Sequence, residues 1–323
     1  MYRVLYLSIA VLVPVVALHA DDKDNGKWVP ISESITSKFK PGPFTKTAGV
    51  AVDPTTGDVY MIVSDQGMWK STNMGESFER VDGKTIGGRC ETGFALNFDP
   101  SGKRLACFMI YGSSGSTDDS GKTWTAWKTS HLDFGAVDWG ATGKCFLAIR
   151  HEKQGMLTLS TDAGKTWTDL GKDFVRVGLF DEKVLVCGRK KGLARSEDGG
   201  KTWSDVSDVT PAGYVMVVKD GIGYWATEKG LFVSKDKGKT WEIQGAAVSA
   251  VHGPYFGKKP ENMVVVGKDG FLETTDGGKA WKKVAPLPEG FKVGGVGPNY
   301  AWDPVNDIFY ASSMGKETFR FKR

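Results

Sequence analysis

Residues 160–167 read Ser-Thr-Asp-Ala-Gly-Lys-Thr-Trp, and this phrase decides the fold because it recurs along the chain. Clean copies follow at residues 196–203 and 234–241. Near-complete copies lie at 117–124 and 274–281, and a degraded copy lies at 71–78. The central glycines of successive copies are 36 to 46 residues apart. A repeat of this length indicates a solenoid or a propeller, built from one supersecondary unit per repeat.

The segments between the copies predict short β-strands. Residues 50–52, the turn Asp-Pro-Thr-Thr-Gly-Asp at 53–58 and residues 59–63 read as strand, turn and strand. A third strand, such as residues 67–71 or 230–234, leads into each copy of the phrase, and a fourth strand follows it. Four antiparallel strands per repeat make one propeller blade.

The residues of the phrase suit a tight turn between the third and fourth strands. An Asp side chain can accept hydrogen bonds from backbone N–H groups one or two residues further on. The glycine supplies a positive φ, and the Trp begins the outer strand with a large face to bury. These roles are architectural, so the repeated residues are poor candidates for chemistry.

The two ends of the chain predict how the ring closes. Residues 301–310 repeat the layout of residues 51–60, so a seventh unit begins near Val293, but it stops at Arg323 after only three strands. Residues 24–31 resemble the phrase with one residue deleted and can supply the missing outer strand. Pairing of the two ends would leave no open sheet edge. We therefore predict an all-β fold, a closed seven-bladed propeller.

Residues 1–20 have the make-up of a secretory signal, with Arg3 before an apolar run and Ala20 at a plausible cleavage position. We expect one domain over residues 21–323 in a secreted or periplasmic, monomeric protein. Loss of Arg3 with the leader reduces 42 basic residues to 41 against 38 acidic ones, a net charge of +3. This near-balance argues against a nucleic-acid partner.

The four cysteines leave their pairing open. Cys107, Cys145 and Cys187 fall on second strands of successive blades, where a cysteine usually acts as a small apolar residue. An oxidising compartment would permit two disulfides, together with Cys90, but four cysteines allow three pairings. There is no Cys-x-x-Cys motif and no histidine pair with metal-ligand spacing, so we expect no metal and no cofactor.

The repeats and the predicted closure resemble the Asp-box propellers, also called bacterial neuraminidase repeat propellers, over nearly all of residues 26–323. That superfamily includes sialidases, xyloglucan-cleaving glycosidases, sortilin-type receptors and proteins similar to photosystem II assembly factors. The even spacing and the Gly-Lys-Thr-Trp form of the turns look most like the secreted bacterial sequences grouped with assembly factors and xyloglucanases. Because the fold does not fix the function, the site has to be sought in the loops.

In a propeller, the loops leading into the innermost strands and those joining second to third strands gather at one end of the central channel. We call this end the loop mouth. Its predicted carboxylates are Glu91, Asp133 and Glu152, the candidates for glycosidase catalysis, which needs two carboxylates across one sugar. Its predicted ligand-binding residues are Arg89, Arg150, Arg176, Arg189, Lys190, Tyr214 and Tyr300.

Two enzymatic interpretations can be compared with these residues. Sialidases carry an Arg-Ile-Pro-type segment near the start of the domain, but residues 37–48 contain no Arg. Xyloglucan-cleaving enzymes place their site between two seven-bladed domains, and this chain predicts only one. A lone histidine such as His131, His151 or His252 is more often a surface or hydrogen-bonded residue than a base.

The cations of the loop mouth favour a binding function. They come from consecutive blades three to six, and together they would form a positive sector suited to carboxylates or sulfates. Arg150, Arg176 and Arg189 are the better candidates within it, because Arg can bind such groups with two hydrogen bonds. The leading hypothesis is a non-catalytic binding or assembly module for a partner protein or an anionic glycan. The alternative is a single-domain glycoside hydrolase.

Overall fold

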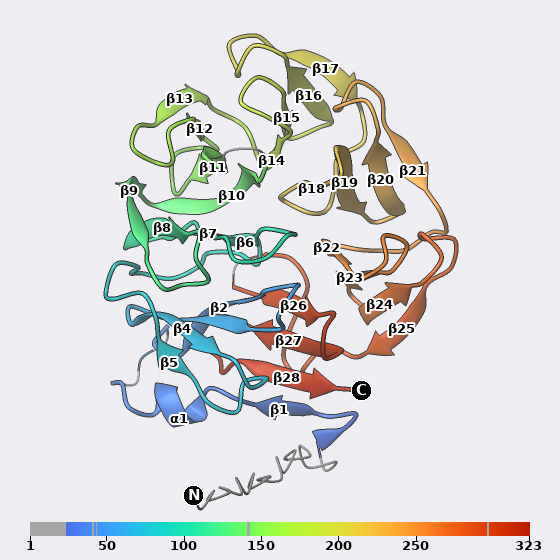
Figure 1. Cartoon of the computed structure of the whole chain (residues 1–323). Coiled ribbons are helices and arrows are strands. Elements are labelled where there is room, and N and C mark those ends of the chain that lie inside the picture. The colour runs from blue at the N-terminus through green and yellow to red at the C-terminus, as the bar shows by residue number, and fades with distance from the viewer. Residues whose placement is uncertain (1–23, 41, 43, 141–142, 296) are drawn as a thin grey trace, which may run out of the picture.

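The computed structural model describes residues 24–40, 42, 44–140, 143–295 and 297–323, and its strands form a ring of seven sheets (Figure 1). Each sheet contains four antiparallel strands, with the first strand of a blade innermost and the fourth outermost. The predicted seven-bladed propeller is confirmed. The predicted signal segment at residues 1–20 lies outside the described residues.

The first three blades occupy the N-terminal half of the ring. Blade 1 contains β2 (Thr47–Val52), β3 (Val59–Val63), β4 (Gly67–Ser71) and β5 (Glu79–Arg80). Blade 2 contains β6 (Leu96–Phe98), β7 (Leu105–Cys107), β8 (Ser113–Thr117) and β9 (Thr125–Ser130). Blade 3 contains β10 (Leu132–Asp138), β11 (Cys145–Arg150), β12 (Leu157–Ser160) and β13 (Thr168–Gly171).

The remaining blades complete the ring. Blade 4 contains β14 (Arg176–Leu179), β15 (Leu185–Gly188), β16 (Leu193–Ser196) and β17 (Ser204–Ser207). Blade 5 contains β18 (Val217–Lys219), β19 (Ile222–Thr227), β20 (Gly230–Ser234) and β21 (Glu242–Gln244). Blade 6 contains β22 (His252–Phe256), β23 (Met263–Gly267), β24 (Gly270–Thr274) and β25 (Lys282–Ala285). Blade 7 contains β26 (Asn299–Asp303), β27 (Ile308–Ser312), β28 (Phe319–Lys322) and, from the other end of the chain, β1 (Trp28–Pro30).

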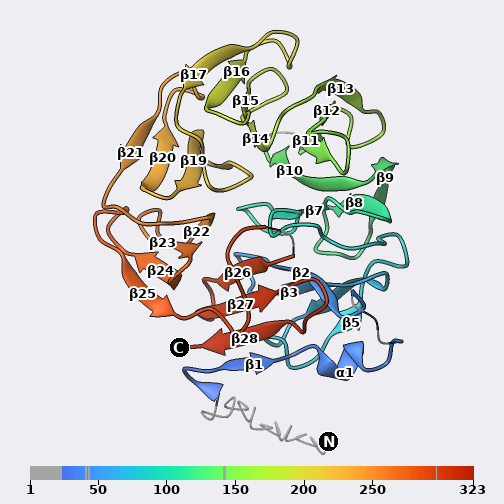
Figure 2. The ribbon, with the colours of Figure 1, turned by 180° about the vertical axis from the view of Figure 1, so that it is seen from behind.

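The pairing of β1 with β28 closes the ring. Trp28 lies opposite Phe321 in an antiparallel register, and the two strands run side by side in both views (Figures 1 and 2). The indole Nε1 of Trp28 also donates a hydrogen bond to the carbonyl oxygen of Pro286, at 2.9 Å. The predicted closure by the N-terminal segment is therefore confirmed, and blade 7 begins at Asn299 rather than near Val293.

The repeated turn, defined as residues 160–167 and their equivalents, is held by its first and third residues. The Ser160 hydroxyl accepts a hydrogen bond from the backbone N–H of Gly164, at 2.9 Å. The Asp162 carboxylate accepts both the backbone N–H and the hydroxyl of Thr166, at 2.9 and 2.7 Å. The Asp therefore reaches four residues ahead, further than the one or two residues predicted, because the turn curls back over its side chain.

The repeated turn also joins neighbouring blades. The residue before its glycine presents a carbonyl oxygen that accepts a hydrogen bond from the preceding blade. Tyr60 donates to Ser120 at 2.8 Å, Arg195 donates to Lys237 at 2.7 Å, and Arg320 donates to Met74 at 2.8 Å. The last of these bonds links blade 7 to blade 1, so the contact continues across the closure.

The core consists of apolar side chains packed between adjacent blades. Tyr60 of blade 1 packs on Phe98 of blade 2 with ring centroids 5.4 Å apart, and Phe271 of blade 6 packs on Phe309 of blade 7 at 4.7 Å. All four cysteines are buried and unpaired, and burial raises their thiol pKa values. Outside the blades lies α1 (Glu33–Thr36), a single helical turn that the strand pattern does not predict. Within the described ranges, no helix is long and apolar enough to cross a membrane.

Candidate functional site

The strand pairing of blade 3 brings two loop-mouth residues together. Leu132, at the start of β10, pairs with Arg150 at the end of β11, and the register shifts between Leu132 and Phe134, so Asp133 is an extra residue beside the end of β11. As a result, His151 Nδ1 lies 2.6 Å from Asp133 Oδ1. The loops entering the innermost strands and those joining second to third strands do meet here.

Blade 2 adds a tyrosine to this pair. Tyr111 follows Ile110, which is bridged to Arg89 by backbone hydrogen bonds. Its hydroxyl lies 3.1 Å from His151 Nε2 and 3.4 Å from Glu152 Oε1. The ring of His131 packs edge-on against Tyr111, with centroids 5.3 Å apart. These contacts join blades 2 and 3 into one polar cluster.

The three predicted carboxylates share this cluster, and their charges affect one another. Burial raises the pKa of Glu91, the charges of Asp133 and Glu152 raise it further, and His151 and Arg89 oppose the shift. Burial also raises the pKa of Asp133, against the lowering effect of its hydrogen bond to His151. Proximity of like charges and loss of hydration both favour the protonated carboxyl. The structure thus groups Glu91, Asp133 and Glu152 around His151.

The hydroxyl of Tyr111 lies beside a carboxylate. The nearby charge of Glu152 contributes to raising the pKa of that hydroxyl above its ordinary value.

The backbone around the cluster is strained. Tyr111, His131 and Glu152 have φ values of 51°, 57° and 54°, in the left-handed region that side chains with a Cβ rarely adopt. Such conformations cost free energy and tend to gather where loops are shaped for function. Three of them meet at this one cluster.

Arg89 lies beside the cluster, between two exposed aromatic rings. Its guanidinium carbon is 4.9 Å from the ring centroid of Phe44 and 4.9 Å from that of Tyr111. Both rings are unusually open to solvent, at 45% and 47% exposure. Among the described residues, the buried Nε of Arg89 has no hydrogen-bond partner, and no carboxylate forms an ion pair with the side chain. We call Phe44, Arg89 and Tyr111 the arginine sandwich.

The other predicted arginines differ in how far they are already engaged. Arg150 forms an ion pair with Asp169 at 2.7 Å and donates to two threonine hydroxyls. Arg176 donates to the carbonyl oxygen of Pro211, packs over the ring of Tyr214, and has its pKa lowered by burial. Arg189 is exposed and packs over Phe174, at 5.1 Å from the ring centroid. Only Arg189, with its exposed neighbours Lys190 and Lys191, leaves its charge open to solvent.

The two predicted tyrosines belong to the wall of the channel. Tyr214 packs between Phe94 and Phe134, with ring centroids 5.3 and 5.2 Å away. Tyr300 is 2% exposed, and its hydroxyl donates to the carbonyl oxygen of Lys292 at 2.7 Å. Neither ring is presented to the loop mouth as an open stacking surface.

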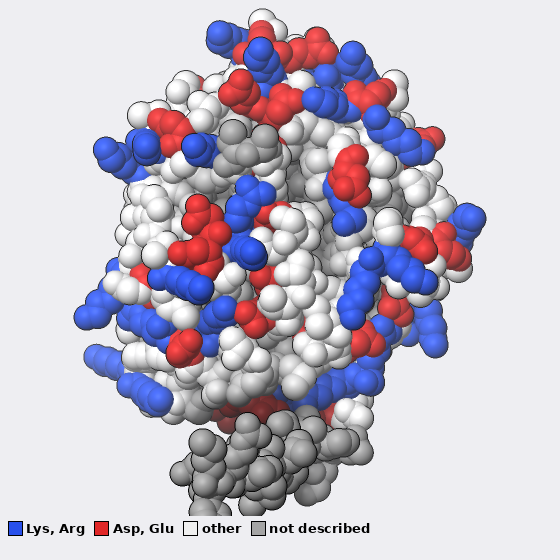
Figure 3. All heavy atoms as spheres, viewed as in Figure 1, with Lys and Arg blue, Asp and Glu red and all other residues white. Residues whose placement is uncertain are grey.

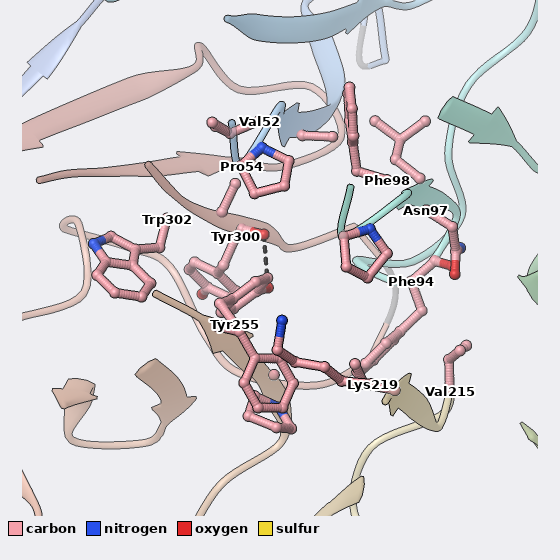
Figure 4. A pocket seen from close by; sticks show the side chains of 18 of the residues that line it. Val52, Pro54, Phe94, Asn97, Phe98, Val215, Lys219, Tyr255, Tyr300 and Trp302 are labelled. Carbon is pink, nitrogen blue, oxygen red and sulfur yellow. Dashed lines mark hydrogen bonds between the residues drawn. The ribbon is translucent and has the colours of Figure 1, made fainter. Parts of the chain in front are cut away.

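A cavity of about 520 Å³ occupies the central channel. Its wall comes from the innermost strands and from the turns that follow them, as Pro54, Phe98, Tyr255 and Trp302 illustrate (Figure 4). No carboxylate side chain is among the described residues that line it, and Lys219 and Lys258 are its only charged groups. The surface view shows charged side chains of both signs spread over this face, some beside the central hollow and others at the outer edge of the ring (Figure 3).

No site for a metal ion is evident among the described residues, because no group of three His, Cys, Asp or Glu side chains converges in a suitable way. Sequence reasoning missed Phe44 and Tyr111, the exposed members of the arginine sandwich. Its position in the repeat could have indicated Tyr111. This residue lies in the loop after the second strand of blade 2, and His151 lies in the loop after the second strand of blade 3.

No protein-family model matches the sequence, and no curated protein matches it. Solved structures do match. YCF48 from Cyanidioschyzon merolae aligns with a TM-score of 0.50 at 11% identity, covering 91% of this chain and 98% of that one. An ancestral GH74 enzyme aligns with a TM-score of 0.51 at 16% identity, covering 90% and 46% of the two chains.

The extracellular domain of a candidate hybrid two-component system from B. thetaiotaomicron aligns with a TM-score of 0.53 at 10% identity. That alignment covers 85% of this chain and 40% of the other. At these identities the likeness shows the fold alone. These matches agree with the propeller fold predicted from the repeated phrase.

Proposed function

We propose that this protein is a secreted or periplasmic, non-catalytic binding module that holds a partner protein or an anionic glycan at the loop mouth. The observation that carries the proposal is the arginine sandwich: a cation without an acidic partner among the described residues, between two exposed aromatic rings. Aromatic residues and arginine supply most of the binding energy at known interfaces.

The chemistry of Arg89 fits an anionic ligand. A guanidinium group can bind a carboxylate or sulfate with two parallel hydrogen bonds. The rings of Phe44 and Tyr111, each 4.9 Å from its guanidinium carbon, can restrict the orientation of the group by cation–π attraction. The same rings can cover an apolar side chain or the face of a sugar. Arg189 and Lys190 can add charge from blade 4, where both are exposed.

A glycoside hydrolase is the second candidate, and the grouping of Glu91 with Asp133 favours it. A hydrolase needs one carboxylic acid with a raised pKa beside a second carboxylate, and both pKa values are raised here. Two observations weigh against it. Asp133 is already engaged by His151, and no carboxylate lines the channel cavity, where a sugar would be enclosed.

The test combines binding with turnover on the full chain. An array of acidic and neutral glycans, together with acidic peptides, is probed with wild type, Arg89→Ala and Lys165→Ala. Lys165 is an exposed cation of a repeated turn, so its variant makes the same charge change away from the loop mouth. We expect an acidic ligand to bind, Arg89→Ala to weaken binding by about tenfold or more, and Lys165→Ala to bind as wild type does.

Release of reducing sugar is measured on the same glycans. Binding without release supports the binding module. Release that disappears in Glu91→Gln or Asp133→Asn would replace the proposal with the hydrolase. If Arg89→Ala binds the ligand as tightly as wild type does, the arginine sandwich is not part of the binding site.

A further inference from the structure

The wall of the channel cavity reaches the end of the ring opposite the arginine sandwich, and it also includes Gly93 and Phe94 of the loop that leads into β6. Strand β10 connects the two regions, because Asp133 of the polar cluster lies near its start and Trp139, which lines the cavity, follows its end. Six residues of extended chain span roughly 20 Å. The cavity reaches the turns between first and second strands, represented by Pro54, Pro100 and Val305. We call this end the turn mouth.

Aromatic rings pack together at the inner end of the cavity. Phe94 stacks on His252 with ring centroids 4.5 Å apart, and Tyr300 packs edge-on against the same histidine at 5.0 Å. His252 is only 1% exposed, and neither ring nitrogen has a hydrogen-bond partner among the described residues. Burial lowers its pKa to about 3, so the ring is uncharged at neutral pH. Among the described residues, no charged side chain lies at this end of the cavity to pair with a charged group of a ligand.

At the turn mouth, two lysines are among the residues that line the cavity. The ammonium group of Lys219 lies 5.2 Å from the ring centroid of Phe256, and the Lys219 side chain extends toward Tyr255 (Figure 4). Lys258 is exposed beside it on the cavity wall. Neither lysine forms a salt bridge with any described residue, and no acid lines the cavity. Two lysines that form no ion pair with a described residue therefore lie at the opening of the channel cavity.

The wall also limits which ligands the channel cavity can bind. Most of its exposed surface is apolar, and the hydroxyl of Tyr255 already donates to the carbonyl oxygen of Tyr300, at 2.7 Å. A sugar, with hydroxyls on all sides, would lose hydration without compensation. A volume of about 520 Å³ lies within the range of small-molecule sites, which are mostly apolar with a few placed polar groups.

We propose that the channel cavity binds a small apolar carboxylate, with its hydrocarbon or aromatic body inside the ring and its carboxylate at Lys219 and Lys258. This site is separate from the arginine sandwich and does not depend on the function proposed for the loop mouth. The ligand is held by burial of its apolar body, and the lysines select the charged end and its orientation.

The test is isothermal titration of the full chain with decanoate and with 4-phenylbutyrate. Decanol and decylammonium share the body of decanoate but carry no charge or the opposite charge. We expect one carboxylate per chain, about tenfold weaker binding of decanol, and weaker binding still of decylammonium. Lys219→Gln and Lys258→Gln should each weaken decanoate binding severalfold, because Gln keeps a polar side chain, one atom shorter, and loses the positive charge.

Two variants serve as matched controls. Lys259→Gln changes an exposed lysine next to Lys258 that does not line the cavity, and it should bind decanoate as wild type does. Arg89→Ala should also bind normally, which separates this site from the loop mouth. Val217→Trp, checked for folding by circular dichroism, places a large ring in the cavity and should abolish binding.

Three outcomes would overturn the proposal. They are no binding of either carboxylate, equal binding of decanol and decanoate, and decanoate binding that Lys219→Gln and Val217→Trp leave unchanged. Binding of an acidic peptide at this mouth without any binding of decanoate would also overturn it, because the occupant would then be a protein.

Discussion

At the scale of single residues, the glycine of the repeated turn meets two separate demands. Gly164 has a φ of +79°, which glycine adopts without penalty. A Cβ atom built on it would lie 2.4 Å from two ring carbons of Trp127, a contact too close for any side chain. Gly277 has a φ of +75°, but a Cβ there would meet nothing within 4 Å. Substitution of Gly277 therefore reports the cost of the backbone conformation alone. Substitution of Gly164 reports that cost together with the cost of the clash with Trp127.

We expect Gly277→Ala to lower the free energy of unfolding by about 1–2 kcal/mol, the cost of a left-handed alanine. Gly164→Ala should cost at least about 1 kcal/mol more, because Trp127 has to move as well. Urea titration of both variants measures the difference. Equal losses would mean that the ring of Trp127 shifts freely, which would contradict its tight packing in the core.

At the scale of the element, the repeated turn works as a hydrogen-bonded unit with a charge at its centre. Bonds from the side chain and the backbone N–H of Thr166 lower the pKa of Asp162 to about 2, and Thr202 does the same for Asp198. A carboxyl that is more acidic in the folded state stabilises the fold above its unfolded pKa of about 3.9. The contribution is lost as the pH falls toward 2, because both states are then protonated.

Stability should therefore decrease between about pH 4 and pH 2 in wild type. In Asp162→Asn/Asp198→Asn the free energy of unfolding should be lower at pH 5 and should change less over the same interval. Urea midpoints at pH 5, 3 and 2 provide the measurement. A double variant with the full pH dependence of wild type would show that other acids control acid unfolding.

The elements also show how far sequence reasoning reaches. The third strands at residues 67–71 and 230–234 were predicted with the bounds of β4 and β20, because a turn motif marks each end. Propeller topology predicts that the loops carrying Asp133 and His151 gather at one mouth, and the two side chains do meet there. Phe44 was missed because an exposed loop has no periodic pattern to reveal it, and Tyr111 was missed although its place after the second strand of blade 2 was available. That no carboxylate lines the channel among the described residues depends on the packing of six inner strands, which no local pattern reports.

At the scale of the whole molecule, stability depends on one three-residue strand. Trp28 of β1 packs against Phe321 and Phe271, with ring centroids 5.4 and 5.8 Å away, and bonds to Pro286. The segment after it is anchored by buried Glu317, which accepts hydrogen bonds from Ser32 and Thr36. Closure thus joins blades 6 and 7 through side chains as well as through the sheet.

We expect Trp28→Ala to lower the free energy of unfolding by about 2–3 kcal/mol, since a half-buried indole and its hydrogen bond are both lost. Lys27→Ala, at the exposed neighbouring position, should change it by less than about 0.5 kcal/mol. Chemical denaturation of the two variants gives the comparison. A Trp28→Ala variant as stable as wild type would mean that the pairing of β1 with β28 contributes little to the stability of the ring.

The placement of β1 beside β28 has a consequence for biosynthesis. Residues 28–30 leave the ribosome early, but their partner at residues 319–322 is made almost last. Six blades can form while translation proceeds, yet the seam stays open until the final residues emerge. A polypeptide with this order of strands completes its ring only after β28 has been made and has paired with β1.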